Sequence, residues 1–203
     1  MNRDSAVVYV VDDDAAVRDS LKVLLESVDL QCQTYASATE FLNNHDPDQH
    51  SCLVADVRMP GMSGIDLQDE LNRQASTIPI LFITGHGDVP MAVDAMKSGA
   101  LDFIQKPFRD QDLLDRIHQA LERDEQRRDD NRDVAEIRNR VARLTGRETE
   151  VMQRVVMGQA NKVIALDLGV SQRTVEIHRA RVMQKMGARS LAELVRMAGK
   201  LAD

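Results

Sequence analysis

Five short apolar runs, separated by helix-length amphipathic segments, constrain the fold of this chain more than any other feature of its sequence. Several runs are apolar at every position rather than at alternate positions, which is typical of parallel strands covered by helices on both faces. The pattern predicts an α/β unit with a doubly wound, five-stranded parallel sheet. The predicted strands are Ala6–Val11, Cys32–Ala36, Cys52–Asp56, Ile78–Thr84 and Asp102–Gln105.

Polar side chains stand where four of these predicted strands end. Asp12 and Asp13 follow the first strand, Asp56 ends the third, Thr84 ends the fourth and Lys106 follows the fifth. Because parallel strands bring their carboxyl ends to one edge of a sheet, we expect these side chains to lie close together. Three clustered carboxylates repel one another unless a cation neutralises them, and oxygen ligands favour a hard ion. The sequence therefore predicts a Mg²⁺ site.

The same edge has the chemistry needed to accept a phosphoryl group. A carboxylate beside Mg²⁺ can act as a nucleophile, while a lysine and a hydroxyl can hold the oxygens of the transferred group. Asp56 is the best placed acceptor. Singly, the neighbouring residues have ordinary explanations: Asp14 as a helix N-cap, Thr84 as a strand residue and Lys106 as a solvated charge. Their occurrence together favours the phosphoryl site.

The uneven distribution of charge indicates two domains. Residues 1–122 contain 9 Lys and Arg against 21 Asp and Glu, a net charge of −12, whereas residues 144–203 contain 10 against 6, a net charge of +4. An acidic unit followed by a basic one is typical of domains with different partners. We expect a first domain at 1–122, a charged and helical linker at 123–141, and a second domain at 142–203.

The cysteines and the N-terminal stretch indicate a reducing compartment. Cys32 and Cys52 lie in apolar, strand-like stretches without metal-ligand spacing, so we expect small buried side chains. The apolar run Ala6–Val11 is far shorter than the roughly 18 residues of a membrane span. We therefore expect a cytoplasmic protein that does not contact a membrane.

Helix-start and helix-stop signals divide the C-terminal part into four short helices. Thr145–Glu148 and Ser190–Glu193 have the pattern of capping boxes, and Gly158, Gly169 and Gly187 fall where helices should end. The two helices around Gly169 have the short helix, turn and longer helix of a helix-turn-helix motif. The sequence predicts a small all-α domain.

The second helix of this motif, for which Ser171 is the expected N-cap, has two different sides. The side expected to face the core consists of Val175, His178, Val182 and Met186. The other side consists of Arg173, Glu176, Ile177, Ala180, Arg181 and Gln184. Arginines suit phosphates or guanine, a glutamate can accept from cytosine, and an apolar side chain can contact a thymine methyl. This combination favours a helix that reads DNA, with a solvated protein-binding helix as the alternative.

The segment between the two domains contains a short apolar seam. Residues 123–133 are polar on all sides, which fits a solvated helix or a flexible linker. Val134, Ile137, Val141 and Leu144 then follow at spacings of three, four and three residues. Such a seam could pair two chains or dock on the last domain, and the sequence favours neither.

Residues 1–122 resemble the receiver domain of bacterial two-component response regulators. The resemblance rests on the stretches VVDDD, LVADVRMPGMSGIDL, ITGHGD and DFIQKPF. It implies a flavodoxin-like fold in which Asp56 is the phosphorylated residue. It also implies that Asp12, Asp13, Asp56 and the backbone carbonyl of Arg58 form the Mg²⁺ site.

The resemblance further implies how the switch is built. Thr84 and Lys106 are expected to contact the phosphoryl oxygens, and Phe103 is expected to follow the movement of Thr84. The peptide bond from Lys106 to Pro107 is expected to be cis, which is uncommon even for proline.

Residues 144–186 resemble the LuxR-type helix-turn-helix, and its combination with a receiver resembles the FixJ branch of the NarL/FixJ regulators. By this resemblance Glu176, Ile177 and Ala180 face bases. The phosphate-contact candidates are Lys162, Arg173, Thr174, Arg179 and Arg181. On the helical wheel Arg179 lies nearest the core.

Both resemblances imply a transcription regulator that takes a phosphoryl group from a histidine kinase and binds promoter DNA as a homodimer. RNA polymerase is an expected partner, and no turnover of a substrate is expected. The alternative is an orphan regulator of the same fold that is not switched by phosphate. A phosphatase of the haloacid dehalogenase kind would need an aspartate two positions after the nucleophile, where this chain has Arg58.

Overall fold

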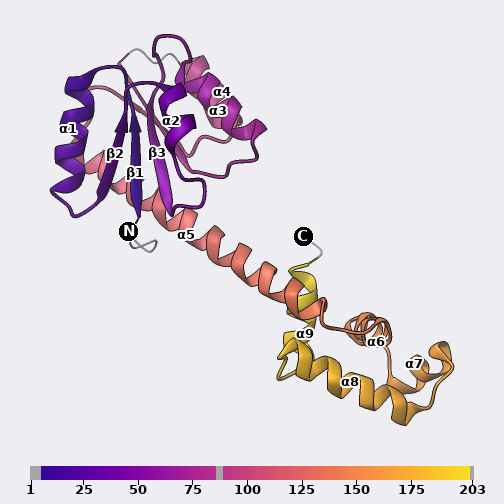
Figure 1. Cartoon of the computed structure of the whole chain (residues 1–203). Helices are drawn as coiled ribbons and strands as arrows, with labels where there is room; N and C mark the ends of the chain where they lie inside the picture. The colour runs from indigo at the N-terminus through magenta and orange to yellow at the C-terminus, as the bar shows by residue number, and fades with distance from the viewer. Residues whose placement is uncertain (1–5, 86–88, 202–203) are drawn as a thin grey trace. The chain divides into compact units, whose positions relative to one another are not determined.

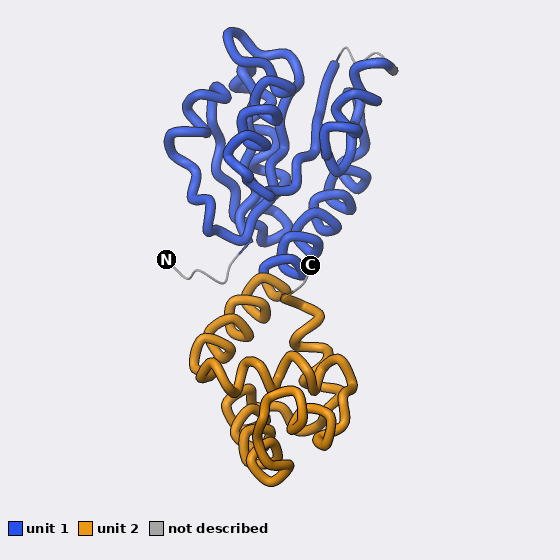
Figure 2. The backbone as a smooth tube through the Cα atoms, turned by 90° about the vertical axis from the view of Figure 1, so that its right-hand side faces the viewer, with its two compact units in different colours: residues 1–128 blue, residues 129–203 orange. Residues whose placement is uncertain are grey.

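The computed structural model describes residues 6–85 and 89–201. The chain forms two compact units, residues 1–128 and residues 129–203 (Figure 2). Across the described ranges, no helix combines the length and the apolar character that a membrane crossing requires.

The first unit contains the predicted five-stranded parallel sheet, in the order β2-β1-β3-β4-β5 (Figure 1). The strands are β1 Val7–Val11, β2 Gln31–Tyr35, β3 Ser51–Asp56, β4 Ile80–Thr84 and β5 Asp102–Gln105. The strand order reverses between β1 and β3, and ligands of open α/β sheets bind beyond the carboxyl ends of the strands at such a reversal. The predicted edge with Asp12 and Asp56 is therefore the expected place for a site.

Helices cover both faces of this sheet, as the apolar runs predicted. The helices of the first unit are α1 Ala15–Glu26, α2 Ala38–Asn44, α3 Gly64–Arg73, α4 Val89–Lys97 and the first part of α5 Asp110–Val141. On one face α1 and α5 pack against β1, β3 and β4, and on the other face α2, α3 and α4 do so (Figure 1).

Strand β1 shows why its sequence is apolar at every position. Tyr9 points to one face, where it packs edge-on against Phe41 of α2. Val8 and Val10 point to the other face, where they pack with Leu25 of α1. Because successive side chains of a strand alternate between faces and both faces are covered, each position is buried and must be apolar.

The two cysteines lie in the sheet without a disulfide between them. Cys52 is fully buried and Cys32 is half-buried. Burial raises the pKa of the Cys32 thiol to about 11 and raises that of Cys52 further, so both thiols stay protonated at neutral pH. They behave as the small buried side chains that the sequence predicted.

The second unit is the small all-α domain that the sequence predicted. After the end of α5 it contains α6 Gly146–Val156, α7 Asn161–Leu168, α8 Gln172–Met186 and α9 Leu191–Gly199. The residues that follow α7 and α8, Gly169 and Gly187, adopt the left-handed conformation that favours glycine. Gly169 lies in the turn between the two helices of the predicted helix-turn-helix motif, and Gly187 ends the second of them.

The four predicted N-caps, Asp14, Thr145, Ser171 and Ser190, are present. Asp14 accepts from the backbone N–H of Ala16 at 2.8 Å and so caps α1. Thr145 and Glu148 form the full capping box of α6. The second predicted box is different: Ser190 accepts from the N–H of Glu193, but the Glu193 carboxylate accepts from the N–H of Arg189. The reciprocal bond is therefore shifted by one residue.

The apolar seam docks on the second unit. Ile137 is buried in the core of that unit, and Val141 and Leu144 pack against it. Arg140 supports the contact by donating to the backbone carbonyl of Met186 at 2.7 Å. Of the two alternatives that the sequence left open, the structure shows docking within the chain.

Candidate functional site

Lys106 joins two acidic residues at the carboxyl edge of the sheet. Its ammonium donates to Asp12 Oδ2 at 2.8 Å and to Asp56 Oδ1 at 2.9 Å. Asp12 is 1% exposed and Asp56 is 7% exposed. The fold therefore brings together side chains that lie 44 to 94 positions apart in the sequence, from the ends of β1, β3 and β5.

Both oxygens of each buried carboxylate have a donor. The second oxygen of Asp56 accepts from the N–H of Arg58 at 2.7 Å, and that of Asp12 accepts from the N–H of Asp14 at 2.9 Å. Burial disfavours the charged form of Lys106, but its hydrogen bonds to Asp12 and Asp56 outweigh this and raise its pKa. The charged ammonium in turn offsets the repulsion between the two carboxylates.

The other predicted residues of this site occupy different environments. Asp13 is exposed, although it adjoins Asp12 in the sequence. Thr84 is buried at the end of β4, and its carbonyl accepts from the N–H of Lys106 at 2.7 Å. Phe103 is half-buried, with its ring tilted against Phe82 at 6.4 Å between centroids. The bond from Lys106 to Pro107 is cis, as the resemblance implied.

The carboxylate oxygens of Asp12 and Asp56 suit a hard cation, although the Lys106 ammonium already supplies positive charge to both carboxylates. Within residues 6–85 and 89–201, no group of three or more His, Cys, Asp or Glu side chains is arranged to hold a metal ion. The two buried carboxylates nevertheless offer only oxygen ligands, which is the chemistry that Mg²⁺ prefers. An ion at Asp12 competes with Lys106, since both oxygens of Asp12 are engaged.

The second unit presents the predicted outer face of α8 to solvent. Ser171 accepts from the N–H of Thr174 at 3.1 Å and so caps the helix, as predicted. The inner side chains Val175, Val182 and Met186 are buried, and His178 is half-buried beside them. The exposed side chains are Arg173, Glu176, Ile177, Ala180, Arg181 and Gln184.

A shallow hollow on this face contains one residue that sequence reasoning missed. It is lined by Gln172, Arg173, Glu176, Ile177 and Ala180. The amide of Gln172 donates to Glu176 Oε1 at 3.4 Å, so the two polar side chains form a pair on the outer face. Their spacing of four residues was the available signal, because side chains four apart share one face of a helix.

The phosphate-contact candidates differ in how free their side chains are. Lys162 in α7 and Arg181 in α8 are exposed. The hydroxyl of Thr174 lies 2.8 Å from that of Ser171. Arg179 is half-buried and donates to Asn161 Oδ1 at 3.1 Å, which links α8 to α7. Of these candidates, Arg179 therefore has an evident structural role within the domain.

Glu148 connects the start of α6 to α8. It is 2% exposed, and one carboxylate oxygen accepts from Lys185 Nζ at 2.6 Å and from the N–H of Thr145 at 2.8 Å. These interactions, with the Lys185 hydrogen bond the largest, lower the pKa of Glu148 to about 2. The capping box was visible in the sequence, but the contact with Lys185, 37 residues away, was not.

We expect the second unit to lose stability in acid because of Glu148. Its folded pKa of about 2 lies below the usual value of about 4.3, so its contribution is complete above that value and is lost as the pH falls toward 2. Glu148→Gln should start less stable at pH 7 and decline less steeply, as measured by thermal melting between pH 7 and about 2. Glu150→Gln on the same helix is the control, and parallel curves for Glu148→Gln and the wild type would contradict the assignment.

Two family models match the two units. The response regulator receiver domain matches residues 8–118, and the luxR family of bacterial regulatory proteins matches residues 142–198. Each match covers the candidate site described for its unit.

Individual proteins are similar over nearly the whole chain. Nodulation protein W of Bradyrhizobium diazoefficiens is 52% identical over 97% of this chain and 86% of its own length. The transcriptional regulatory protein FixJ of Azorhizobium caulinodans is 49% identical over 96% and 92%. The solved structure of the response regulator StyR is 47% identical, covers 97% of this chain and 99% of its own, and superimposes with a TM-score of 0.87. The chain belongs to the two-component response regulators in which a receiver domain is joined to a LuxR-family DNA-binding domain, and it is a transcriptional regulator of that family.

Proposed function

We propose that Asp56 accepts a phosphoryl group from a phosphohistidine of the kinase, and that this uptake strengthens dimeric binding of promoter DNA. The observation that supports the acceptor is the position of Asp56: it is the carboxylate at the end of β3, held by Lys106 on one oxygen and by the N–H of Arg58 on the other. Asp12, after the neighbouring strand β1, accepts a hydrogen bond from the same lysine. We propose that it assists Asp56 rather than accepting the phosphoryl group itself.

The transfer itself needs a nucleophile and stabilised phosphoryl oxygens. An oxygen of Asp56 attacks phosphorus, the bond from phosphorus to the imidazole nitrogen breaks, and an acyl phosphate forms on Asp56. Lys106 and Thr84 are the proposed contacts to the phosphoryl oxygens. Phe103 is proposed to respond to Thr84. The product is a lasting modification of the regulator, so no substrate is turned over.

Receiver domains bind Mg²⁺ at their acidic pocket. In this chain the proposed ligands are Asp12, Asp13, Asp56 and the backbone carbonyl of Arg58. When bound, the ion supplies positive charge that offsets the carboxylates and the incoming phosphoryl group.

We expect Mg²⁺ to stabilise the protein by mass action, since the folded pocket binds it and the unfolded chain does not. The melting temperature should rise between zero and tens of millimolar Mg²⁺, roughly the range that a weak site needs, at fixed ionic strength. Asp13→Asn should reduce the rise, because it removes an exposed carboxylate without disturbing the bonds of Asp12 and Asp56. A melting temperature independent of Mg²⁺ would exclude the proposed site.

The outer face of α8 is proposed to lie in the major groove. Its apolar, acidic and cationic side chains match the base edges and phosphates that a recognition helix meets. The proposed base contacts are Glu176, Ile177 and Ala180. The proposed phosphate contacts are Lys162, Arg173, Thr174, Arg179 and Arg181.

An exposed apolar strip on α4 is the proposed site of receiver self-association. Val93 and Met96 are exposed there, whereas Ala95 is buried and belongs to the core. The sequence also offers Val89, the first residue of α4, to this strip, but its side chain lies outside the described residues. The same holds for Asp88, which precedes the helix. A phosphorylated pocket can favour pairing only through a difference in affinity between two arrangements of this surface.

The dimer proposal has a direct test with small-molecule phosphodonor and Mg²⁺. Phosphorylated full-length protein should self-associate in sedimentation and bind a two-half-site operator more tightly, with half-sites about one helical turn apart. Binding should fall steeply with salt because of the Lys and Arg contacts. An unchanged monomer with unchanged DNA affinity would favour the orphan regulator, and rapid multiple turnover of the donor would favour a phosphatase.

One further partner and a location follow from this proposal. Promoter DNA in a bacterium lies in the cytoplasm, so we place the protein there. We also propose RNA polymerase as a partner, because a regulator bound at a promoter acts on transcription by that enzyme.

A further inference from the structure

Arg18 of α1 is bonded to the loop between β1 and α1, which consists of Asp12, Asp13 and Asp14. Its guanidinium donates to the backbone carbonyl of Asp12 at 2.7 Å. Its backbone N–H donates to the carbonyl of Asp14 at 3.1 Å, which is the first bond of the helix. Arg18 therefore joins the helix to the acidic loop at two points, and the phosphoryl transfer proposed above uses neither of these bonds.

The bond from Arg18 completes a set that holds Asp12 at every polar group. The Asp12 N–H donates to the carbonyl of Tyr35 at 3.3 Å, and its carboxylate oxygens accept from Lys106 and from a backbone N–H. Arg18 holds the remaining group, the carbonyl. Because a peptide group is planar, fixing this carbonyl also fixes the position at which the chain enters Asp13.

Asp13 depends on this support because its side chain has no other. It is exposed, and its carboxylate takes part in none of the hydrogen bonds or ion pairs found among the described residues. The carboxylates of Asp12 and Asp56, in contrast, have a donor on each oxygen. Of the three carboxylates proposed as Mg²⁺ ligands, that of Asp13 is therefore the one whose position depends on the backbone that carries it.

Arg18 exerts two opposite effects on a cation in this pocket. Its positive charge repels the ion, whereas its bond to the Asp12 carbonyl keeps the loop in place. The Arg18 side chain is half-buried, so water and salt screen its charge. Groups that orient metal ligands from outside, in contrast, typically change metal affinity by about 10- to 100-fold. We therefore expect the orienting effect to dominate.

We propose that Arg18 is a positioning residue of the acidic pocket, which holds the Asp12 carbonyl and thereby directs the Asp13 carboxylate toward Mg²⁺. Arg18 acts through the loop and not by contact with the ion or the phosphoryl group. It sets the affinity for Mg²⁺, and through it the rate of phosphoryl uptake when Mg²⁺ is limiting. The inference rests on the proposed Mg²⁺ site and deepens it by naming the residue that keeps an exposed ligand in place.

NMR titration of the full chain with Mg²⁺ at fixed ionic strength tests this role, with the backbone amide of Asp13 as the reporter. Arg18→Met keeps the apolar part of the side chain and removes the donor, so it should weaken Mg²⁺ binding about tenfold. Arg18→Lys restores a donor and should recover part of the loss. An affinity in Arg18→Met equal to or higher than that of the wild type would overturn the proposal, because repulsion would then outweigh positioning.

A double-mutant cycle shows whether Arg18 acts through Asp13. Asp13→Asn should weaken Mg²⁺ binding, and Arg18→Met should add little in that background, because the carboxylate that it positions is already gone. Fully additive effects of the two substitutions would refute the positioning role alone. Absence of Mg²⁺ binding in the wild type would overturn the proposed metal site and this inference together, so the two failures are distinguishable.

The rate of phosphoryl uptake from a small phosphodonor gives a second readout. In Arg18→Met the Mg²⁺ concentration for half-maximal rate should rise about tenfold. The rate at saturating Mg²⁺ should stay close to that of the wild type, because the bond between Lys106 and Asp56 does not involve Arg18. A lower saturating rate with an unchanged dependence on Mg²⁺ would contradict the proposal.

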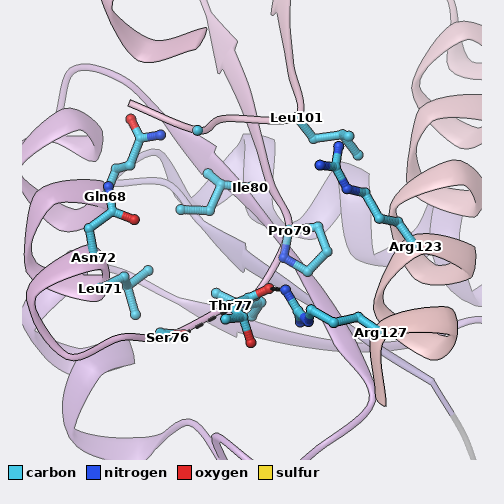
Figure 3. A pocket seen from close by; sticks show the side chains of 12 residues that line it. Gln68, Leu71, Asn72, Ser76, Thr77, Pro79, Ile80, Leu101, Arg123 and Arg127 are labelled. Atoms are coloured by element: carbon cyan, nitrogen blue, oxygen red, sulfur yellow. Dashed lines mark hydrogen bonds between the residues drawn. The ribbon is translucent and has the colours of Figure 1, made fainter. Parts of the chain in front are cut away.

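Two variants control for charge and for stability. Lys22→Met removes a positive charge from the same helix, where Lys22 is exposed and pairs with Glu26, and should leave Mg²⁺ binding unchanged. Arg127→Met removes another bond from an arginine to a backbone carbonyl, that of Thr77, which precedes β4 at the opposite edge of the sheet (Figure 3). It should lower the melting temperature without changing the Mg²⁺ affinity. A similar loss of affinity in either control would attribute the effect of Arg18→Met to charge or stability and refute its positioning role.

Discussion

Asp56→Asn should abolish phosphoryl uptake and leave the receiver folded. An amide oxygen is too weak a nucleophile to form the acyl phosphate, so the expected loss is complete rather than partial. The fold should persist because Lys106 keeps its bond to Asp12, and because the substitution removes one of two carboxylates that repel each other. Intact mass after treatment with a small phosphodonor and Mg²⁺ measures the uptake.

Asp69→Asn is the matched control for this experiment. Asp69 is an exposed carboxylate of α3 in the same unit, and its substitution changes mass and charge by the same amount. The control should take up phosphoryl as the wild type does. Retained uptake in Asp56→Asn would instead move the acceptor to Asp12 or Asp13.

Gly64→Ala should destabilise the receiver and reduce phosphoryl uptake. A Cβ at this position would lie 2.3 Å from the backbone oxygen of Asp56 and 3.1 Å from the Cα of Val57. These are backbone atoms, so either α3 or the end of β3 must move. Overpacking of this kind costs about 1–3 kcal/mol, and here it displaces the residue that we propose as the acceptor. The midpoint of urea unfolding and the phosphorylation assay measure the two effects.

Gly146→Ala is the matched control, because Gly146 occupies the same position relative to its N-cap as Gly64 does. Gly146 begins α6 directly after the N-cap Thr145 of a capping box, just as Gly64 begins α3 directly after the N-cap Ser63 of a capping box. A Cβ on Gly146 would meet no atom within 4 Å, so alanine there should be neutral or stabilising by up to about 1 kcal/mol. Equal stabilities of the two variants would show that the close approach of Gly64 to the backbone of Asp56 and Val57 does not exclude a Cβ at this position.

Local signals were sufficient for much of the architecture. The strands were predictable because a strand buried on both faces needs an apolar residue at every position, as β1 has. Helix starts at Asp14, Thr145 and Ser171 were predictable because a cap bonds within three residues of itself. The strand order was not a local property, but parallel strands joined by helices allow few arrangements.

Other features were decided only where distant segments meet. Asp12 and Asp13 are adjacent and chemically identical, yet the packing of β1 buries the first and exposes the second. The seam at Ile137 could have paired two chains, and it docks because the core of the second unit offers it an apolar surface. The contact of Lys185 with Glu148 had no sequence signal, because it spans 37 residues.

Gly64 and Gly146 show most clearly which properties follow from local sequence and which depend on tertiary packing. Gly64 and Gly146 are each the first residue after the N-cap of a capping box, so the sequence around each predicts the same helix start. Only the approach of α3 to the end of β3 makes a side chain intolerable at Gly64, while Gly146 faces open space. Sequence by itself determined the elements and the chemistry at their ends, because those depend on periodicity and on neighbours a few residues away. Tertiary structure decided which atoms come into contact, because close packing between elements depends on positions that no short stretch of sequence contains.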